Sequence, residues 1–254
     1  MNFKDCIDSY PFILMEGALG ERLKREFDLD ISGTVAMADL IYQQKGRMAL
    51  KTLWNEYMDI AHRYQLPFLA ITPTRRANKE RVYMAGYNES IITDNVDFLR
   101  TIKETVNVNM YIGGLMGCKG DAYTSERALN QEEAIAFHSW QASLFKSVGV
   151  DFLYAGIMPV LSEAIGMAVA MSDTDIPYII SFTIQRNGKL IDGHTINDAI
   201  YYINNHVSNK PVCYMTNCVH PDIVYEALSH KFNQTQMVKN RFWGIQANLS
   251  LIHI

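Results

Sequence analysis

The sequence predicts an α/β fold built on a parallel sheet, and three observations support this prediction. Seven short apolar runs rich in Ile, Leu, Val, Phe or Tyr recur along the chain. They are apolar throughout rather than alternating, which is typical of strands buried on both faces of a parallel sheet. Longer amphipathic segments separate them, without a Pro/Ser-rich linker or a repeat of fixed period, which indicates one domain.

Local sequence patterns predict the individual strands and helices. The predicted strands are Pro11–Met15, Pro67–Ile71, Met110–Gly114, Asp151–Ala155, Tyr178–Phe182, Val212–Met215 and Trp243–Gln246. Apolar residues spaced i, i+3, i+4 and i+7 predict helices over Arg47–Tyr64, Ser90–Thr105, Gln131–Val148, Leu161–Ser172 and Thr195–Val207. Ser125 or Asn130 is a suitable N-cap for the third helix, and Gly149 is a suitable end.

Two architectures share this repeated β/α pattern. One is the eight-stranded (β/α)8 TIM-type barrel, and the other is an open doubly wound sheet. Both place functional side chains at the carboxyl ends of the strands. The segment Glu16–Glu21, which follows the first strand, lacks the G-x-G-x-x-G order of a dinucleotide-binding loop. This absence disfavours the nucleotide-binding form of the open sheet.

Composition excludes several classes of protein. The chain has 254 residues, of which 48% are hydrophobic, and its 23 basic and 27 acidic residues give a net charge of −4. Such a chain has no excess of positive charge to attract nucleic acid or anionic lipid.

The apolar runs are far shorter than the roughly 20 residues of a membrane helix. The start lacks the apolar region of a signal peptide, so we expect a cytoplasmic protein. Four scattered cysteines do not form a disulfide scaffold.

Glu16 is an acidic residue that directly follows the first predicted strand, between apolar residues. Burying a carboxylate is costly unless it meets a cation, so a substrate ammonium group is a reasonable partner. A salt bridge to a neighbouring side chain such as Arg22 is the alternative.

Cys218 follows the sixth predicted strand and is surrounded by Asn217, His220 and Pro221. A lone cysteine beside a strand is commonly a small buried hydrophobe. Its polar, turn-forming neighbours instead favour a thiol at the rim of the sheet, where a thiolate can bind zinc. His220 could form a pair with Cys218, but no C-x-x-C motif or histidine cluster accompanies them.

A series of motifs resembles the homocysteine S-methyltransferase family over about Phe12 to Asn248. The motifs are Phe12–Gly20, Ala70–Thr74, Gly149–Leu153 with Pro159 and Ser162–Glu163, Ser181–Thr183, Asp192–Gly193 and Asn217–Cys218. The resemblance implies a (β/α)8 barrel that transfers a methyl group from a small donor, such as S-methylmethionine or S-adenosylmethionine, to the homocysteine thiol to give methionine. It implies substrate-binding roles for Glu16, Gly17, Thr72 and Asn217. It also implies zinc held by three cysteines, of which Cys218 matches the first.

Two departures from the family pattern stand out. Gly156 occupies the position where the family has a Glu that contacts the substrate amine. The Cys-Cys pair that completes the zinc site follows the eighth strand, and this sequence stops before it. We therefore expect a barrel domain over 1–248 that is truncated after strand seven, with one of three zinc ligands, weak zinc binding and low activity.

The last six residues, Leu249–Ile254, match the translation of a sequencing-library transposon end, so we expect a non-native tail. Two alternative functions remain at this point. One is methyl transfer to another thiol or selenol, which Gly156 favours. The other is a non-catalytic amino-acid-binding barrel. In each case we expect the partners to be small molecules. For a methyltransferase they are a thiol acceptor and a methyl donor.

Overall fold

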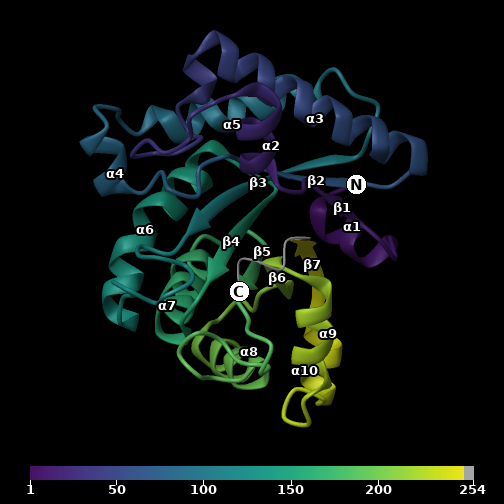
Figure 1. Cartoon of the computed structure of the whole chain (residues 1–254), viewed down its shortest axis with the longest axis vertical. Helices are drawn as coiled ribbons and strands as arrows, with labels where there is room; N and C mark the ends of the chain where they lie inside the picture. Colours follow the sequence, from purple (N-terminus) through teal and green to yellow (C-terminus); the bar gives the residue numbers. More distant parts are fainter. Residues whose placement is uncertain (249–254) are drawn as a thin grey trace. The chain divides into compact units, whose positions relative to one another are not determined.

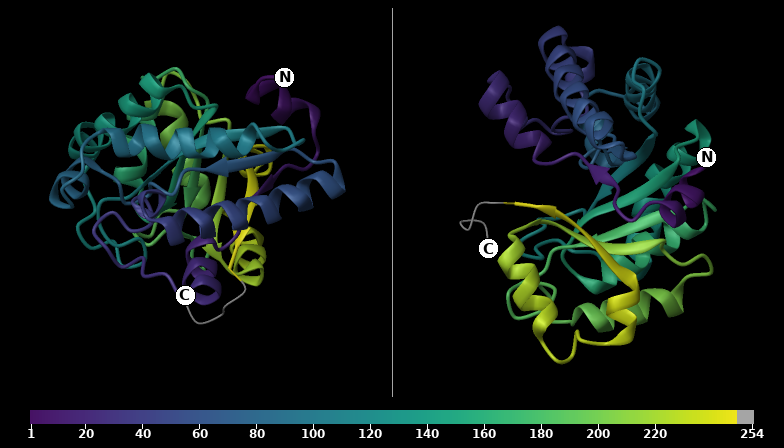
Figure 2. Two further views of the ribbon diagram at one scale, coloured as in Figure 1. Left: turned by 90° about the horizontal axis from the view of Figure 1, so that it is seen from above. Right: turned by 90° about the vertical axis from the view of Figure 1, so that its right-hand side faces the viewer.

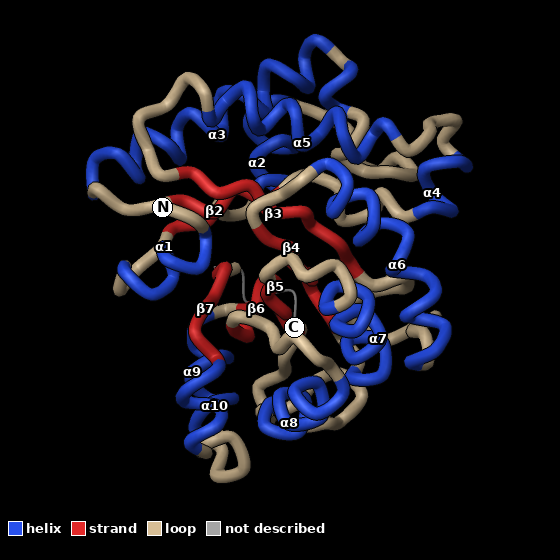
Figure 3. Tube along the Cα trace, turned by 180° about the vertical axis from the view of Figure 1, so that it is seen from behind, coloured by secondary structure: helices blue, strands red, loops and turns tan. Residues whose placement is uncertain are grey.

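The computed structural model of the chain describes residues 1–248. The predicted tail, Leu249–Ile254, lies outside the described residues. Helices and strands alternate along the chain, as the sequence predicts (Figure 3). The seven strands occur in the sheet in their sequence order, β1 to β7. This is the topology of a TIM-type (β/α) barrel with seven of its eight strands inside the described part. It excludes the doubly wound alternative, whose strand order reverses.

The chain forms two compact units (Figure 1). The first unit contains Met1–Met116 and Ser143–Leu153, and the second contains Gly117–Ala142 and the chain from Tyr154 onward. The elements up to the unit boundary are α1 (Phe3–Ser9), β1 (Leu14–Met15), α2 (Leu19–Phe27), the 3-10 helix η1 (Leu40–Tyr42), α3 (Gln44–Tyr64), β2 (Phe68–Ile71), α4 (Lys79–Met84), α5 (Ser90–Lys103) and β3 (Met110–Gly117).

The remaining elements follow β3, and the division between the units runs through α6 and β4. They are α6 (Gln131–Val148), β4 (Phe152–Met158), α7 (Leu161–Ser172), β5 (Tyr178–Phe182), α8 (Ile196–His206), β6 (Cys213–Val219), α9 (Pro221–Ser229), α10 (Gln236–Arg241) and β7 (Phe242–Ala247). No helix within residues 1–248 is long and apolar enough to cross a membrane.

In the first unit, β2 lies between β1 and β3, and both pairings are parallel. The long helix α3 and helix α5 run side by side in this unit (Figure 2). The apolar stripe that predicts α3 is buried, including Leu50, Leu53 and Trp54. The first strand is shorter than the predicted Pro11–Met15, because Pro11 has no N–H to give to a ladder and Phe12 is 73% exposed.

In the second unit, β6 pairs in parallel with β5 on one side and β7 on the other. Helices α6 and α7 have the predicted bounds. Asn130 caps α6, because its Oδ1 accepts a hydrogen bond from the Glu133 N–H at 3.0 Å. Thr195 is the N-cap of α8 rather than its first residue, since its side chain accepts from the Asp198 N–H.

The prediction that every strand is buried on both faces is wrong for β1, whose two residues are half-buried, and for β7. The residues of β7 alternate between half-buried and exposed along the strand. Trp243 is 53% exposed and Ile245 is 40% exposed, so no element of the described residues covers that face. The short apolar run Trp243–Gln246 could not distinguish a two-sided from a one-sided strand.

Candidate active site

Glu16 lies directly after β1 and is 4% exposed. Its Oε1 accepts a hydrogen bond from the Ile71 N–H at 2.8 Å, which ties the carboxyl group to the end of the neighbouring strand β2. Burial raises the pKa of Glu16 to about 8, although the hydrogen bond from Ile71 opposes the rise. A buried carboxyl group with a pKa near neutrality gains its charge readily when a cation approaches.

Arg22, the alternative partner expected for Glu16, forms ion pairs with two other carboxylates. Arg22 lies on α2, and its guanidinium forms ion pairs with Glu26 and Glu56, both at 2.6 Å. It also lies over the ring of Tyr57, 5.4 Å from the ring centroid. The Tyr57 hydroxyl donates to the Gly17 carbonyl oxygen at 2.5 Å. Gly17 is exposed, and this hydrogen bond from Tyr57 holds its backbone carbonyl group in place.

Thr72 follows β2 and is fully buried. Its Oγ1 accepts from the Leu115 N–H at 3.1 Å and lies 2.7 Å from the Thr74 Oγ1. Thr74 Oγ1 donates to the Leu115 carbonyl oxygen at 2.8 Å, so the proton between the two threonines belongs to Thr72. Thr72 thus lies beside Ile71, the hydrogen-bond partner of Glu16, and its hydroxyl fastens the end of β2 to β3.

In the second unit, Asn217 near the end of β6 is 8% exposed and joins three strands. Its Oδ1 accepts from the Ile157 N–H of β4 at 3.0 Å and from the Ser181 Oγ of β5 at 2.6 Å. Its Nδ2 donates to the Cys218 Sγ at 3.8 Å. One amide therefore connects the ends of β4, β5 and β6.

The two residues that Asn217 contacts on β4 and β6 have unusual backbones. Ile157 has φ +57° and Cys218 has φ +60°. A left-handed conformation is rare outside glycine, and for a β-branched residue such as isoleucine it is an outlier. Strain of this kind persists only where neighbouring contacts hold it, and it concentrates at functional sites. Cys218 is partly exposed, as the sequence predicts for a rim thiol.

The residues present do not form a zinc site. Across residues 1–248, no three His, Cys, Asp or Glu side chains are grouped to hold a metal ion. The possible partner of Cys218, His220, is instead the N-cap of α9, where its Nδ1 accepts from the Asp222 N–H at 3.2 Å. Cys213 is buried in β6, and burial raises its pKa to about 12.

Gly156 lies in the buried strand β4, so this position offers no side chain to a ligand. A second carboxylate in the same unit, Glu163 on α7, is fully buried but is used inside the protein. Its oxygens accept from the Lys119 N–H at 2.7 Å, from the Leu129 N–H at 3.3 Å, and lie 3.1 Å from His138 Nε2. Glu163 therefore holds both ends of the loop that follows β3.

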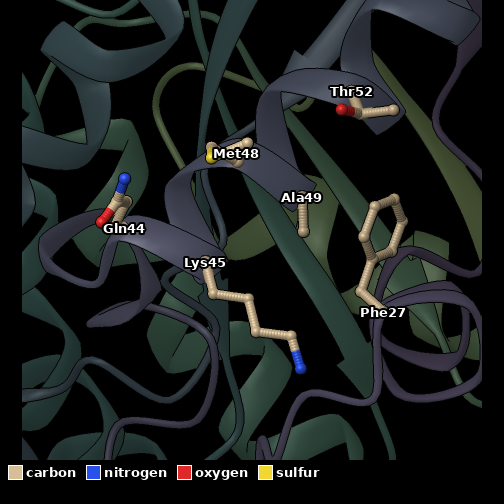
Figure 4. Close-up of a pocket in the computed structure, with 6 residues that line it drawn as sticks. All are labelled: Phe27, Gln44, Lys45, Met48, Ala49 and Thr52. Carbon is tan, nitrogen blue, oxygen red and sulfur yellow. The ribbon is translucent and has the colours of Figure 1, made fainter.

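A surface pocket of ≈ 330 Å³ lies on the first unit (Figure 4). It is lined by Phe27, Gln44, Lys45, Met48, Ala49 and Thr52. None of the candidate residues from the sequence lines it. The candidate residues of each unit therefore lie at its strand ends and not in this pocket.

Sequence reasoning missed Tyr57 and Ser181 as parts of the site. Tyr57 is a member of the amphipathic stripe of α3, which predicts helix packing and not a hydroxyl contact. Ser181 is a fully buried polar residue inside the apolar run of β5. A buried hydroxyl needs a hydrogen-bond partner, and this requirement is the signal that could have indicated Ser181.

Parallel strands in sequential order, with polar side chains at their carboxyl ends, define a barrel enzyme of the TIM type. The family model for homocysteine S-methyltransferase matches residues 13–251, and the chain belongs to this family of methyltransferases. The resemblance inferred from the sequence motifs is thereby confirmed.

Solved structures give the same fold. The chain is similar to the homocysteine methyltransferase MmuM from Escherichia coli in its metallated form, with 18% identity and a TM-score of 0.74 over 95% of this chain and 93% of that chain. The oxidized form of MmuM gives 17% identity and a TM-score of 0.75 with the same coverage. No curated protein sequence matches the chain.

Proposed function

We propose that the chain binds homocysteine through its amino group and transfers a methyl group to its sulfur. The observation that carries this proposal is the buried Glu16 at the end of β1, whose pKa is raised to about 8. An ammonium group that enters beside Glu16 restores the charged form of the carboxyl group and forms a charge-assisted hydrogen bond. Membership of the homocysteine S-methyltransferase family supports homocysteine as the acceptor.

Gly17 and Thr72 belong to the proposed amino-group site of the first unit with distinct tasks. Gly17 presents the backbone next to Glu16, and Thr72 fixes the strand end that carries the Ile71 N–H. Asn217 holds Cys218 at the rim of the second unit.

In the proposed reaction the homocysteine sulfur attacks a methyl carbon attached to a positively charged donor atom. The new S–CH₃ bond forms while the donor bond breaks, the bonding electron pair stays with the donor, and the thiol proton passes to water. The donor is S-methylmethionine, S-adenosylmethionine or a similar small molecule. No step is assigned to zinc, because only Cys218 is present as a matching ligand and the described residues form no metal group. We therefore expect low turnover for this chain.

Gly156 favours a second candidate within the same class of reaction. Because position 156 carries no carboxylate, the amino group of the acceptor has one fewer anionic partner than in the family pattern. Another thiol or a selenol would then serve as the acceptor. A panel of thiols and selenols, assayed for methylated product with each donor, separates the two candidates.

Calorimetric titration of homocysteine over a range of pH tests the proposal. Binding requires ionised Glu16, so the affinity should rise as the pH increases from 6 to 8 and then level off, in line with a pKa of about 8. An affinity that is constant or falls over this interval would contradict the assignment of Glu16 to the amino group.

A further inference from the structure

The segment that carries Glu16 contains a strained backbone position. Ala18, the N-cap of α2, has φ +51° and makes no side-chain capping hydrogen bond. A left-handed conformation is unfavourable for alanine compared with glycine. The segment between β1 and α2 therefore depends on outside contacts to keep this conformation.

Tyr57 on α3 provides such a contact. Its hydroxyl donates to the Gly17 carbonyl oxygen at 2.5 Å, and that carbonyl belongs to the peptide bond that joins Gly17 to Ala18. The orientation of this peptide plane sets the φ angle of Ala18. The hydrogen bond therefore acts directly on the strained residue, two positions after Glu16.

The Tyr57 side chain is itself held at its ring, by Phe68 and Arg22, and at its hydroxyl, by Gly17. Its ring stacks on Phe68 at the start of β2, with centroids 6.0 Å apart and an interplanar angle of 18°. The Arg22 guanidinium lies over the ring, and Arg22 is fixed in turn by Glu26 and Glu56. Burial raises the pKa of Tyr57, although the Arg22 side chain opposes the rise, so the hydroxyl remains a donor.

We propose that Tyr57 is a positioning residue for the substrate amino group, acting through the Gly17–Ala18 peptide on Glu16. This inference rests on the proposed function for its ligand. Glu16 is held at its carboxyl group by the Ile71 N–H, and the backbone of the next residue, Gly17, is held by the Tyr57 hydroxyl. Loss of the second contact lets the carboxylate move away from the geometry that binds an ammonium group.

Tyr57→Phe tests the inference because it removes the hydroxyl and keeps the ring on Phe68 and Arg22. Loss of one hydrogen bond of ordinary strength predicts a homocysteine affinity about 3- to 10-fold weaker. Tyr42→Phe is the matched control. Tyr42 also stacks on an aromatic ring, that of Tyr87, and its hydroxyl also donates at 2.5 Å, but to the Asp94 carboxylate and not to the Glu16 segment. Its affinity should be unchanged.

A double-mutant cycle separates positioning from a general loss of packing. Because Tyr57 acts through Glu16, Tyr57→Phe should weaken binding in the native background and add no further loss to Glu16→Gln. A full additional loss in the Glu16→Gln background would overturn the inference. An unchanged affinity in Tyr57→Phe alone would also overturn it.

Hydrogen exchange measured without ligand tests whether Tyr57 holds the segment, independently of the proposed function. Amides of residues 17–22 should exchange several-fold faster in Tyr57→Phe than in Tyr42→Phe. Faster exchange in a protein that does not bind homocysteine would contradict the proposed function while supporting the positioning of the segment. Unchanged exchange would refute the positioning role even if homocysteine binds.

Discussion

The strand ends of the two units use polar side chains in opposite ways. In the first unit, Glu16 is a buried carboxyl group whose pKa burial raises to about 8, so its burial destabilises the charged form. In the second unit, Asn217 is a buried neutral amide whose oxygen accepts hydrogen bonds from Ile157 and Ser181. The first arrangement is costly without a ligand, whereas the second stabilises the fold. We infer that Glu16 binds the substrate and that Asn217 holds the ends of the strands in position.

The largest effect should come from removing the charge in the first unit. Glu16→Gln should lower the affinity for homocysteine by roughly 100-fold at pH 8.5, because a buried ammonium loses its charged partner. Calorimetry measures this loss. Glu226→Gln is the matched control, since Glu226 is an exposed carboxylate on α9 that pairs with Arg186, and its affinity should change little.

The comparison also separates what the sequence could predict from what it could not. An acidic residue between apolar residues at a strand end is visible in the sequence, and Glu16 is indeed buried there. The hydrogen bonds of Asn217 could not be predicted, because Ile157 and Ser181 lie 60 and 36 residues away and meet it only after folding. The hydroxyl contact of Tyr57 was hidden for the same reason, since its spacing predicts only the buried face of a helix.

Prediction of the fold from the sequence was limited in the same way. Sequential strands and the bounds of α6 and α7 followed from apolar runs and helical spacing. The exposed face of β7 did not, since periodicity over four residues cannot indicate how many faces of a strand are covered.

Stability should respond most strongly in the second unit. Asn217→Ala leaves the buried Ile157 N–H and the Ser181 hydroxyl without their acceptor, so the free energy of unfolding should fall by about 2–3 kcal/mol. Urea unfolding measures the change. In the control Asn205→Ala, an exposed amide on α8 that donates to the Tyr201 carbonyl is removed, and stability should stay within about 0.5 kcal/mol. Equal losses in both variants would contradict the bridging role.

Stability should also depend on pH through Glu16. The folded-state pKa of about 8 lies above the ordinary value of 4.5, so the folded state keeps a proton that the unfolded state loses. The contribution of the Glu16 proton to the free energy of unfolding is therefore complete below pH 4.5 and is lost as the pH rises towards 8. Between pH 6 and 7 the free energy of unfolding should fall by about 1 kcal/mol more in the native protein than in Glu16→Gln. Parallel pH profiles would show that Glu16 ionises normally.

The smallest effect is expected on the exposed face of β7. Trp243 is 53% exposed, so Trp243→Thr removes little buried apolar area and keeps a residue that favours strands. The free energy of unfolding should change by no more than about 0.5 kcal/mol. A loss several times larger, measured by urea unfolding, would mean that this face is covered in solution.

The central claim is that Glu16 recognises the amino group of homocysteine. Its most direct test is a calorimetric comparison of homocysteine with 4-mercaptobutanoate, the same thiol without the amino group, in the native protein and in Glu16→Gln at pH 8.5. The native protein should bind homocysteine at least 10-fold more tightly than 4-mercaptobutanoate, as expected for a lost charge-assisted contact. Glu16→Gln should bind the two thiols about equally. A preference for homocysteine that survives unchanged in Glu16→Gln would contradict the account.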